Sequence, residues 1–191
     1  MKTALLGGTF NPVHFGHLFL ADEVLHKAGY DHIIFVPTFM PAHKKMKSPV
    51  KPADRLEMLN IAVKPYDCFS VDDCEIKRKG ISFMIDTLRE VHRKYGFPGK
   101  IGLIIGDDLA DSFHTWKNPQ DILELAELVV VKRLHVKSKN YGFPCTVIEN
   151  KIVSISSTEI RERIQNSEPV RFLLPEGVCS YIEEKKLYRS A

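Results

Sequence analysis

Two glycines and two histidines lie close together near the start of the chain, in the segment GGTFNPVHFGH at residues 7–17. Glycines after a short apolar run let the backbone turn sharply and let a bulky anion come close. The helix expected after them points its N-terminus, with free N–H groups and a positive dipole, at the same place. His14 and His17 are three positions apart, so they share a helix face and can both reach that anion. The segment therefore predicts a phosphate-binding site.

The same segment excludes two common phosphate motifs and leaves two other interpretations open. It matches neither G-x-G-x-x-G nor G-x-x-x-x-G-K-[ST], which argues against a dinucleotide-dependent dehydrogenase and against a P-loop enzyme. An ordinary strand-to-helix turn with two surface histidines is one alternative. A zinc site is the other, although no neighbouring cysteine or carboxylate in the sequence supplies a third ligand.

A second candidate is the Pro- and Lys-rich stretch TFMPAHKKMKSPVK at residues 38–51, which contains Lys44. Such a run is typical of a solvated surface loop. It can also be a mobile cationic arm that closes on a triphosphate. Both interpretations stay open.

A third candidate is SISSTEIR at residues 154–161. Ser156 and Glu159 have the spacing of a capping box, so part of this segment is a helix start. The same helix N-terminus offers Ser157, Thr158 and then Arg161 to an anion.

The fourth candidate is GDDLADSFHTW at residues 106–116. Gly106 and Asp108 follow an apolar run, where a carboxylate can accept hydrogen bonds from ribose hydroxyls. Trp116, the only tryptophan, is either a core residue or a surface on which a flat ligand stacks.

Alternating apolar runs and amphipathic stretches must position these four segments. Apolar runs predict strands at 3–6, 32–36, 69–71, 101–105, 128–131 and 146–153. Helical spacing predicts helices at 15–27, 52–62, 82–95, 118–126, 156–165 and 176–186, the third of them capped by Ser82. This alternation predicts one α/β domain over residues 1–191 with a Rossmann-like, doubly wound, mainly parallel sheet and helices on both faces. Such sheets bind ligands beyond the carboxyl ends of their strands.

Composition narrows the class of protein. The 191 residues are 44% hydrophobic and carry a formal net charge of +3, so we expect a globular protein that binds neither nucleic acid nor membranes. No stretch is long and apolar enough to cross a bilayer, and the first residues do not resemble a signal peptide. The four cysteines form no C-x-x-C pair and read as reduced thiols, which predicts a cytoplasmic protein. The oligomeric state stays open, a homo-oligomer included.

Four segments carry a resemblance to a known family. GGTFNPVHFGH and ISSTEIR resemble the two signatures of the nucleotidyltransferase superfamily with an H-x-G-H motif. IGDDLADSFHTW and SFMIDTL, which lie between them, resemble the bacterial nicotinate mononucleotide adenylyltransferases within it. The resemblance covers nearly the whole chain. It implies an enzyme of NAD biosynthesis that joins ATP and nicotinate mononucleotide to give deamido-NAD and pyrophosphate. It also implies Mg²⁺ that arrives with ATP, and no dedicated metal site.

The resemblance also assigns residues. It implies that the catalytic residues around the reacting phosphates are His14, His17, Lys44 and Arg161. The implied substrate-binding residues are Gly8, Thr9, Phe10, Ser82, Phe83, Met84, Gly106, Asp108, Trp116, Ser156, Ser157 and Thr158, with Trp116 stacked on the pyridine ring.

The segment at 82–84 departs from the family pattern. Family members often have Ser-Tyr-Thr there, near the pyridine substituent, whereas this chain has Ser82-Phe83-Met84. Because two hydroxyl groups are lost, we expect backbone N–H groups near Phe83 and Met84 to bind the carboxylate of nicotinate.

Three rival functions remain. Another enzyme of the superfamily, such as a phosphopantetheine adenylyltransferase, shares the first histidine motif but gives no reason for Trp116 or for SFMIDTL. A non-catalytic nucleotide-binding module needs the glycines and helix ends but neither His17 nor Arg161. A nucleic-acid binder could use the basic run at 132–140, although the near-balanced charge favours a solvated surface there.

Overall fold

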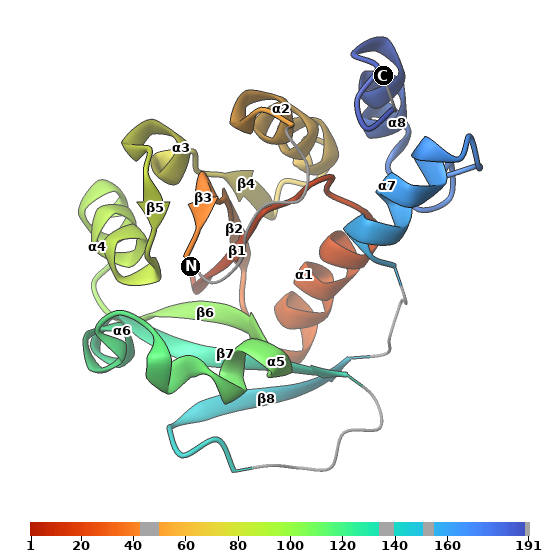
Figure 1. Ribbon diagram of the computed structural model, residues 1–191. Helices are drawn as coiled ribbons and strands as arrows, with labels where there is room; N and C mark the ends of the chain where they lie inside the picture. The colour runs from red at the N-terminus through yellow and green to blue at the C-terminus, as the bar shows by residue number, and fades with distance from the viewer. Residues whose placement is uncertain (43–49, 134–139, 151–154, 190–191) are drawn as a thin grey trace.

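The computed structural model describes residues 1–42, 50–133, 140–150 and 155–189 (Figure 1). Within them, a six-stranded parallel sheet has the order β4-β2-β1-β6-β7-β8. Its strands are β1 (Thr3–Gly8), β2 (His32–Pro37), β4 (Phe69–Val71), β6 (Ile101–Gly106), β7 (Ala126–Arg133) and β8 (Cys145–Asn150). Two short strands, β3 (Met40–Pro41) and β5 (Ile81–Ser82), form a separate parallel pair.

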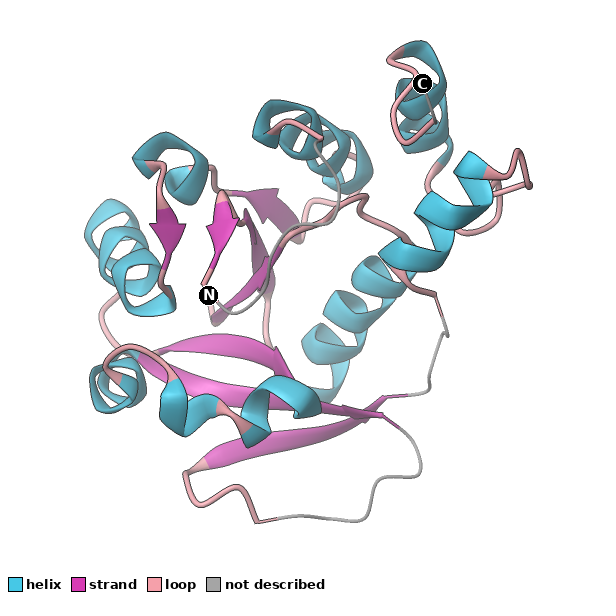
Figure 2. Cartoon of the chain, viewed as in Figure 1, coloured by secondary structure: helices cyan, strands magenta, loops and turns pink. Residues whose placement is uncertain are grey.

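Helices lie on both faces of the large sheet (Figure 2). They are α1 (Phe15–Ala28), α2 (Pro52–Val63), α3 (Cys74–Arg78), α4 (Met84–Tyr95), α5 (Asp107–Asp111), α6 (Pro119–Leu125), α7 (Ser157–Gln165) and α8 (Glu176–Glu184), with a 3₁₀ turn at Phe113–Thr115. This architecture confirms the predicted α/β class and the doubly wound parallel sheet. Within the described ranges, no helix has the length and apolarity that a bilayer crossing requires.

Alternation along the strands divides the core into two layers. Leu6 and Phe35 pack with the apolar faces of α1, α2 and α8. Their chain neighbours Leu5 and Val36 pack with α4, α5 and α6 on the other face. Successive side chains of a strand point to opposite faces, so a strand covered on both sides must be apolar throughout. This is why the predicted strands read as continuous apolar runs.

The centre of the sheet determines where a ligand can bind. Strand β1 pairs with β2 on one side and with β6 on the other. The chain winds outward in both directions from this pair, which makes the carboxyl ends of β1 and β6 the topological switch point. Those ends are Gly8 and Gly106. The first and fourth candidate segments therefore start side by side.

Several predicted details were wrong. Strand β1 continues through Gly7 and Gly8, so the chain does not turn at the glycines. Ser82 does not cap α4: Phe83 occupies the N-cap, and the Ser82 hydroxyl accepts a hydrogen bond from the backbone N–H of Phe39 at 3.3 Å. The pairing of β3 with β5 holds Ser82 in an extended segment instead. The end of the predicted strand at 151–153 lies outside the described residues.

Candidate active site

The loop after β1 owes its shape to a close contact between Gly8 and Phe10. Phe10 is buried and has a φ of +44°, a left-handed conformation that is uncommon for a bulky residue. A Cβ at Gly8 would lie 2.9 Å from the Phe10 ring, so glycine leaves room for that ring. The ring in turn meets the His17 ring edge-on, with centroids 5.0 Å apart. The strained loop therefore supports one of the two motif histidines.

The two histidine rings lie against each other at the start of α1, tilted by 31°. Their ring centroids are 3.8 Å apart, and the backbone N–H of His14 donates to Nδ1 of His17 at 3.3 Å. An accepting Nδ1 places the proton of a neutral His17 on Nε2, which makes Nε2 a hydrogen-bond donor. A Cβ at Gly16 would lie 2.9 Å from Nδ1 of His14, so the glycine between the histidines makes room for the His14 ring.

His14 is the buried member of the pair, with 6% of its surface exposed. Desolvation by burial lowers the pKa of His14 from 6.5 to about 4. The His14 ring is therefore neutral at pH 7 in the ligand-free protein. Any positive charge at the site comes from other groups.

This pKa shift predicts a pH-dependent stability. Between pH 6.5 and pH 4 the unfolded chain binds a proton at His14 that the folded protein excludes, so acidification favours unfolding. We expect His14 to account for a loss of up to about 3 kcal/mol in the free energy of unfolding across that window. Urea titrations of the wild type and of His14→Asn at several pH values measure it. If the free energy of unfolding of His14→Asn falls below pH 6.5 as steeply as that of the wild type, the pH dependence does not come from His14.

The second signature docks directly on the first. Ser157 Oγ donates to the carbonyl of Pro12 at 2.9 Å, and Arg161 Nη1 donates to the carbonyl of Asn11 at 2.8 Å. The other terminal nitrogen of Arg161 donates to Thr158 Oγ1 at 3.1 Å. Segments about 150 positions apart thus form one surface, and the N-terminus of α7 lies beside that of α1 (Figure 1). The predicted capping role of Ser156 is confirmed, since its Oγ accepts from the N–H of Glu159 at 3.1 Å.

A buried arginine that the sequence analysis missed anchors the first loop. Arg55 in α2 has no exposed surface, and its guanidinium donates to the carbonyls of Thr9 at 2.6 Å and Phe39 at 3.3 Å. Burial lowers the pKa of Arg55, while Tyr188 and Glu75 act in the opposite direction. Its signal in the sequence is a lone cation on the apolar face of the helix that Met58, Leu59 and Ala62 share.

A cavity of about 320 Å³ opens at the carboxyl ends of β1 and β6. The predicted binding residues that line it are Gly8, Thr9, Ser82, Phe83, Met84, Asp108 and Trp116. They come from the loop after β1, from the β5–α4 junction and from the segment after β6. These three segments, each predicted separately from the sequence to bind substrate, therefore meet around one cavity. The fourth predicted segment, at the start of α7, contacts the loop after β1.

The remaining predicted residues lie outside the cavity lining. Phe10 is buried beneath His17, and Gly106 caps the N-terminus of α5 next to Asp108. Ser157 and Arg161 of the second signature contact the Asn11–Pro12 turn, whereas Ser156 accepts from Glu159 and Thr158 accepts from Arg161. Lys44 lies outside the described residues.

Two charged groups in the lining were not predicted. Glu75 is almost fully buried, and its Oε1 accepts a hydrogen bond from Thr87 Oγ1 at 2.6 Å. Arg78 donates to the same hydroxyl at 2.9 Å, which fixes the position of Thr87. The other missed group is Lys117, directly after Trp116. Both lie in segments without a recognisable motif.

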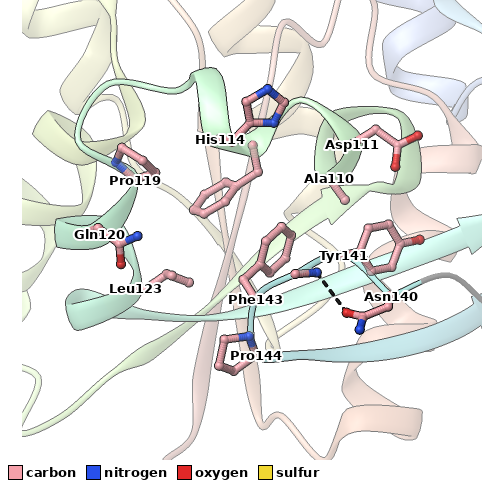
Figure 3. A pocket seen from close by; sticks show the side chains of 12 residues that line it. Ala110, Asp111, His114, Pro119, Gln120, Leu123, Asn140, Tyr141, Phe143 and Pro144 are labelled. Atoms are coloured by element: carbon pink, nitrogen blue, oxygen red, sulfur yellow. Dashed lines mark hydrogen bonds between the residues drawn. The ribbon is translucent and has the colours of Figure 1, made fainter.

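A second cavity, of about 470 Å³, has a separate set of lining residues (Figure 3). Its walls are α5, the 3₁₀ turn, α6 and the segment 140–144 before β8. Phe143 packs there against Phe113, with ring centroids 4.9 Å apart. None of the residues predicted to bind substrate lines this cavity, so size alone does not identify the functional site.

The histidine pair does not form part of a metal site within the described chain. No group of three or more His, Cys, Asp or Glu side chains among the described residues is arranged to hold a metal ion. The zinc interpretation therefore gains no third ligand from this part of the protein.

Known proteins resemble this chain in sequence and in fold. The sequence profile of the cytidylyltransferase-like family matches residues 5–163. The probable nicotinate-nucleotide adenylyltransferase of Borreliella burgdorferi is 46% identical over 188 residues, which are 98% of this chain and 97% of that protein. The protein of the same name from Treponema pallidum subsp. pallidum is 40% identical, and the alignment covers 100% of both chains.

The chain belongs to the nicotinate-nucleotide adenylyltransferase family. The resemblance found in the sequence motifs is thereby confirmed. A solved structure with the same fold is the Plasmodium falciparum nicotinic acid mononucleotide adenylyltransferase complexed with NaAD. It aligns with a TM-score of 0.78 over 98% of both chains at 17% sequence identity, a likeness that concerns the fold alone.

Proposed function

We propose that this protein is a nicotinate-nucleotide adenylyltransferase: it transfers the adenylyl group of ATP to nicotinate mononucleotide and releases pyrophosphate. The observation that carries the proposal is the cavity at the switch point, whose lining includes Gly8, Thr9, Ser82, Phe83, Met84, Asp108 and Trp116. The names of relatives at 40–46% identity support the same reaction.

The substrate supplies the nucleophile in this reaction. A 5′-phosphate oxygen of the mononucleotide attacks the α-phosphorus of ATP in line, and the bond from that phosphorus to the pyrophosphate oxygen breaks. The protein has to position both phosphates and stabilise the charge that develops between them. A protein nucleophile with an adjacent base is not required.

The residues divide into two groups in this proposal. The cavity holds the mononucleotide, with Trp116 against the pyridine ring and Asp108 toward a ribose hydroxyl. His17 Nε2, Arg161 and the N-termini of α1 and α7 surround the ATP phosphates. Lys44 approaches the same phosphates from the 38–51 segment.

Magnesium enters this scheme as part of the substrate. We propose that the ion arrives as MgATP, bound by phosphate oxygens and water, because Mg²⁺ keeps several waters and needs few protein ligands. The chain's own contribution is the positive potential from His17, Arg161 and the helix N-termini.

A substrate panel tests the proposed function. The protein is incubated with MgATP and, separately, with nicotinate mononucleotide, nicotinamide mononucleotide or phosphopantetheine, and pyrophosphate and the adenylylated product are quantified. We expect product with nicotinate mononucleotide. Turnover of phosphopantetheine alone would favour the superfamily alternative, and ATP binding without any turnover would favour a binding module.

Trp116 is expected to govern the mononucleotide and not ATP. It lines the cavity next to Phe113, with ring centroids 5.5 Å apart, and it is only partly buried. Loss of stacking in Trp116→Ala should raise KM for nicotinate mononucleotide about 5- to 150-fold. The KM for ATP should stay nearly unchanged, and Trp116→Phe should retain most of the affinity. A Trp116→Ala protein that melts far below the wild type would instead mark the residue as core.

A further inference from the structure

The cavity lining contains more acidic than basic side chains. Among its described residues, Glu75 and Asp108 carry carboxylates and Lys117 carries the sole ammonium. A carboxylate on the substrate's ring is repelled by Asp108 and by Glu75, whose charge the buried Arg55 partly balances, and it is attracted by Lys117. A substrate whose ring bears a neutral carboxamide experiences neither effect as strongly.

Two contacts hold the ammonium of Lys117 in place. Its Nζ lies 4.6 Å from the centroid of the Phe83 ring and 3.1 Å from Oδ2 of Asp86. A half-exposed ion pair of this kind adds little to stability. It does fix the ammonium above Phe83, which lines the same cavity.

The N-terminus of α4, which forms the cavity wall beside Lys117, adds to the positive electrostatic potential of the ammonium. Phe83 is the N-cap of α4, and Met84 is the first residue of that twelve-residue helix. The N-terminus of a helix carries a partial positive charge. Phe83 and Met84 offer no side-chain hydroxyl to a ligand, and the Ser82 hydroxyl beside them is neutral, so Lys117 is the charged donor on this wall that can bind a carboxylate.

We propose that Lys117 determines the preference of this site for nicotinate over nicotinamide mononucleotide. The inference rests on the proposed function. The ammonium has three N–H donors, so it binds the pyridine carboxylate while it keeps its contact with Asp86. Without Lys117, the described lining holds only the carboxylates of Glu75 and Asp108 as charged groups, and the neutral amide becomes the better ligand.

The test compares the two mononucleotides in Lys117→Met, which keeps the aliphatic stem over Phe83 and removes the charge. We measure kcat/KM for each mononucleotide at saturating MgATP. The ratio of the nicotinate value to the nicotinamide value should fall about 10- to 100-fold, the range for loss of a hydrogen bond to a charged group. Most of the change should come from KM for nicotinate mononucleotide.

Three further variants keep the test decisive. Lys117→Arg, which retains the charge, should keep the preference. Lys77→Met removes an exposed lysine whose ion pair with Asp73 is 2.9 Å long, away from the cavity, and should leave the ratio unchanged. Asp86→Asn keeps a side-chain oxygen that accepts from the ammonium and removes the competing charge, so it should raise the affinity for nicotinate mononucleotide.

The outcomes separate this proposal from the one it rests on. An unchanged ratio in Lys117→Met overturns the role of Lys117 and assigns the selection to other donors, such as backbone N–H groups near Phe83. A wild-type protein that adenylylates neither mononucleotide overturns the proposed function itself. Should Lys117→Met fold poorly, a weaker preference for nicotinate in Asp86→Asn overturns the proposal independently.

Discussion

Replacing His17 with alanine is expected to lower kcat by about 10²–10³ while the protein stays folded, as is typical when a donor to the transition state is removed. The Nδ1 of His17 accepts from the His14 backbone, which orients the imidazole and leaves Nε2 as the nitrogen that carries the proton of the neutral ring. Phe10 supports the ring from one side. A donor held this firmly needs no reorganisation when charge develops on the phosphates.

Steady-state kinetics with both substrates and a thermal melt measure this effect. His26→Ala is the matched control, because His26 lies in the last turn of the same helix and is exposed. It should leave kcat unchanged. A His17→Ala protein that melts normally and turns over at near wild-type rate would remove His17 from the mechanism.

Arg55→Met is expected to destabilise the protein by about 3 kcal/mol, because it leaves two partly buried carbonyl groups without their charged donor. Those carbonyls belong to Thr9 and Phe39, on the two loops that border the cavity. The variant also removes the positive charge that faces the buried Glu75. Methionine keeps much of the side-chain volume, so the loss reports the guanidinium and not an empty space.

Urea denaturation measures the free energy of unfolding of this variant. Arg89→Met is its control, since Arg89 forms a half-exposed ion pair with Asp121 and its loss should cost well under about 1 kcal/mol. Equal effects of the two substitutions would show that Arg55 has no special structural role. The kcat of Arg55→Met should also fall, since Arg55 positions the backbone of Thr9.

Features that depend on residues close together in the chain could be predicted from the sequence. The His14–His17 spacing, the Ser156 cap and the apolar strands each follow from residues within a few positions of one another, and the structure contains all three. The five-residue helices α3 and α5 were not predicted, because they are too short to show a helical period.

The parts of the site that depend on contacts between residues far apart in the chain could not be predicted from the sequence. Arg55 lies 46 positions from Thr9, so its place on the apolar face of α2 does not indicate in the sequence which carbonyl groups it binds. Lys117 acquires its place only because α4 brings Phe83 and Asp86 under it. Ser82 was assigned to a helix start because its residue type suits a cap, but the pairing of β5 with β3 overrode that local preference.

The fate of the ATP phosphates distinguishes adenylyl transfer from every other reaction of ATP. The protein is incubated with nicotinate mononucleotide and Mg²⁺, once with ATP labelled on the α-phosphate and once with ATP labelled on the γ-phosphate, and the products are separated. In-line attack on the α-phosphorus predicts α label in the dinucleotide and γ label in pyrophosphate, in equal amounts. Label from the γ-phosphate in the mononucleotide product or in inorganic phosphate would mean a kinase or an ATPase, and would contradict the account.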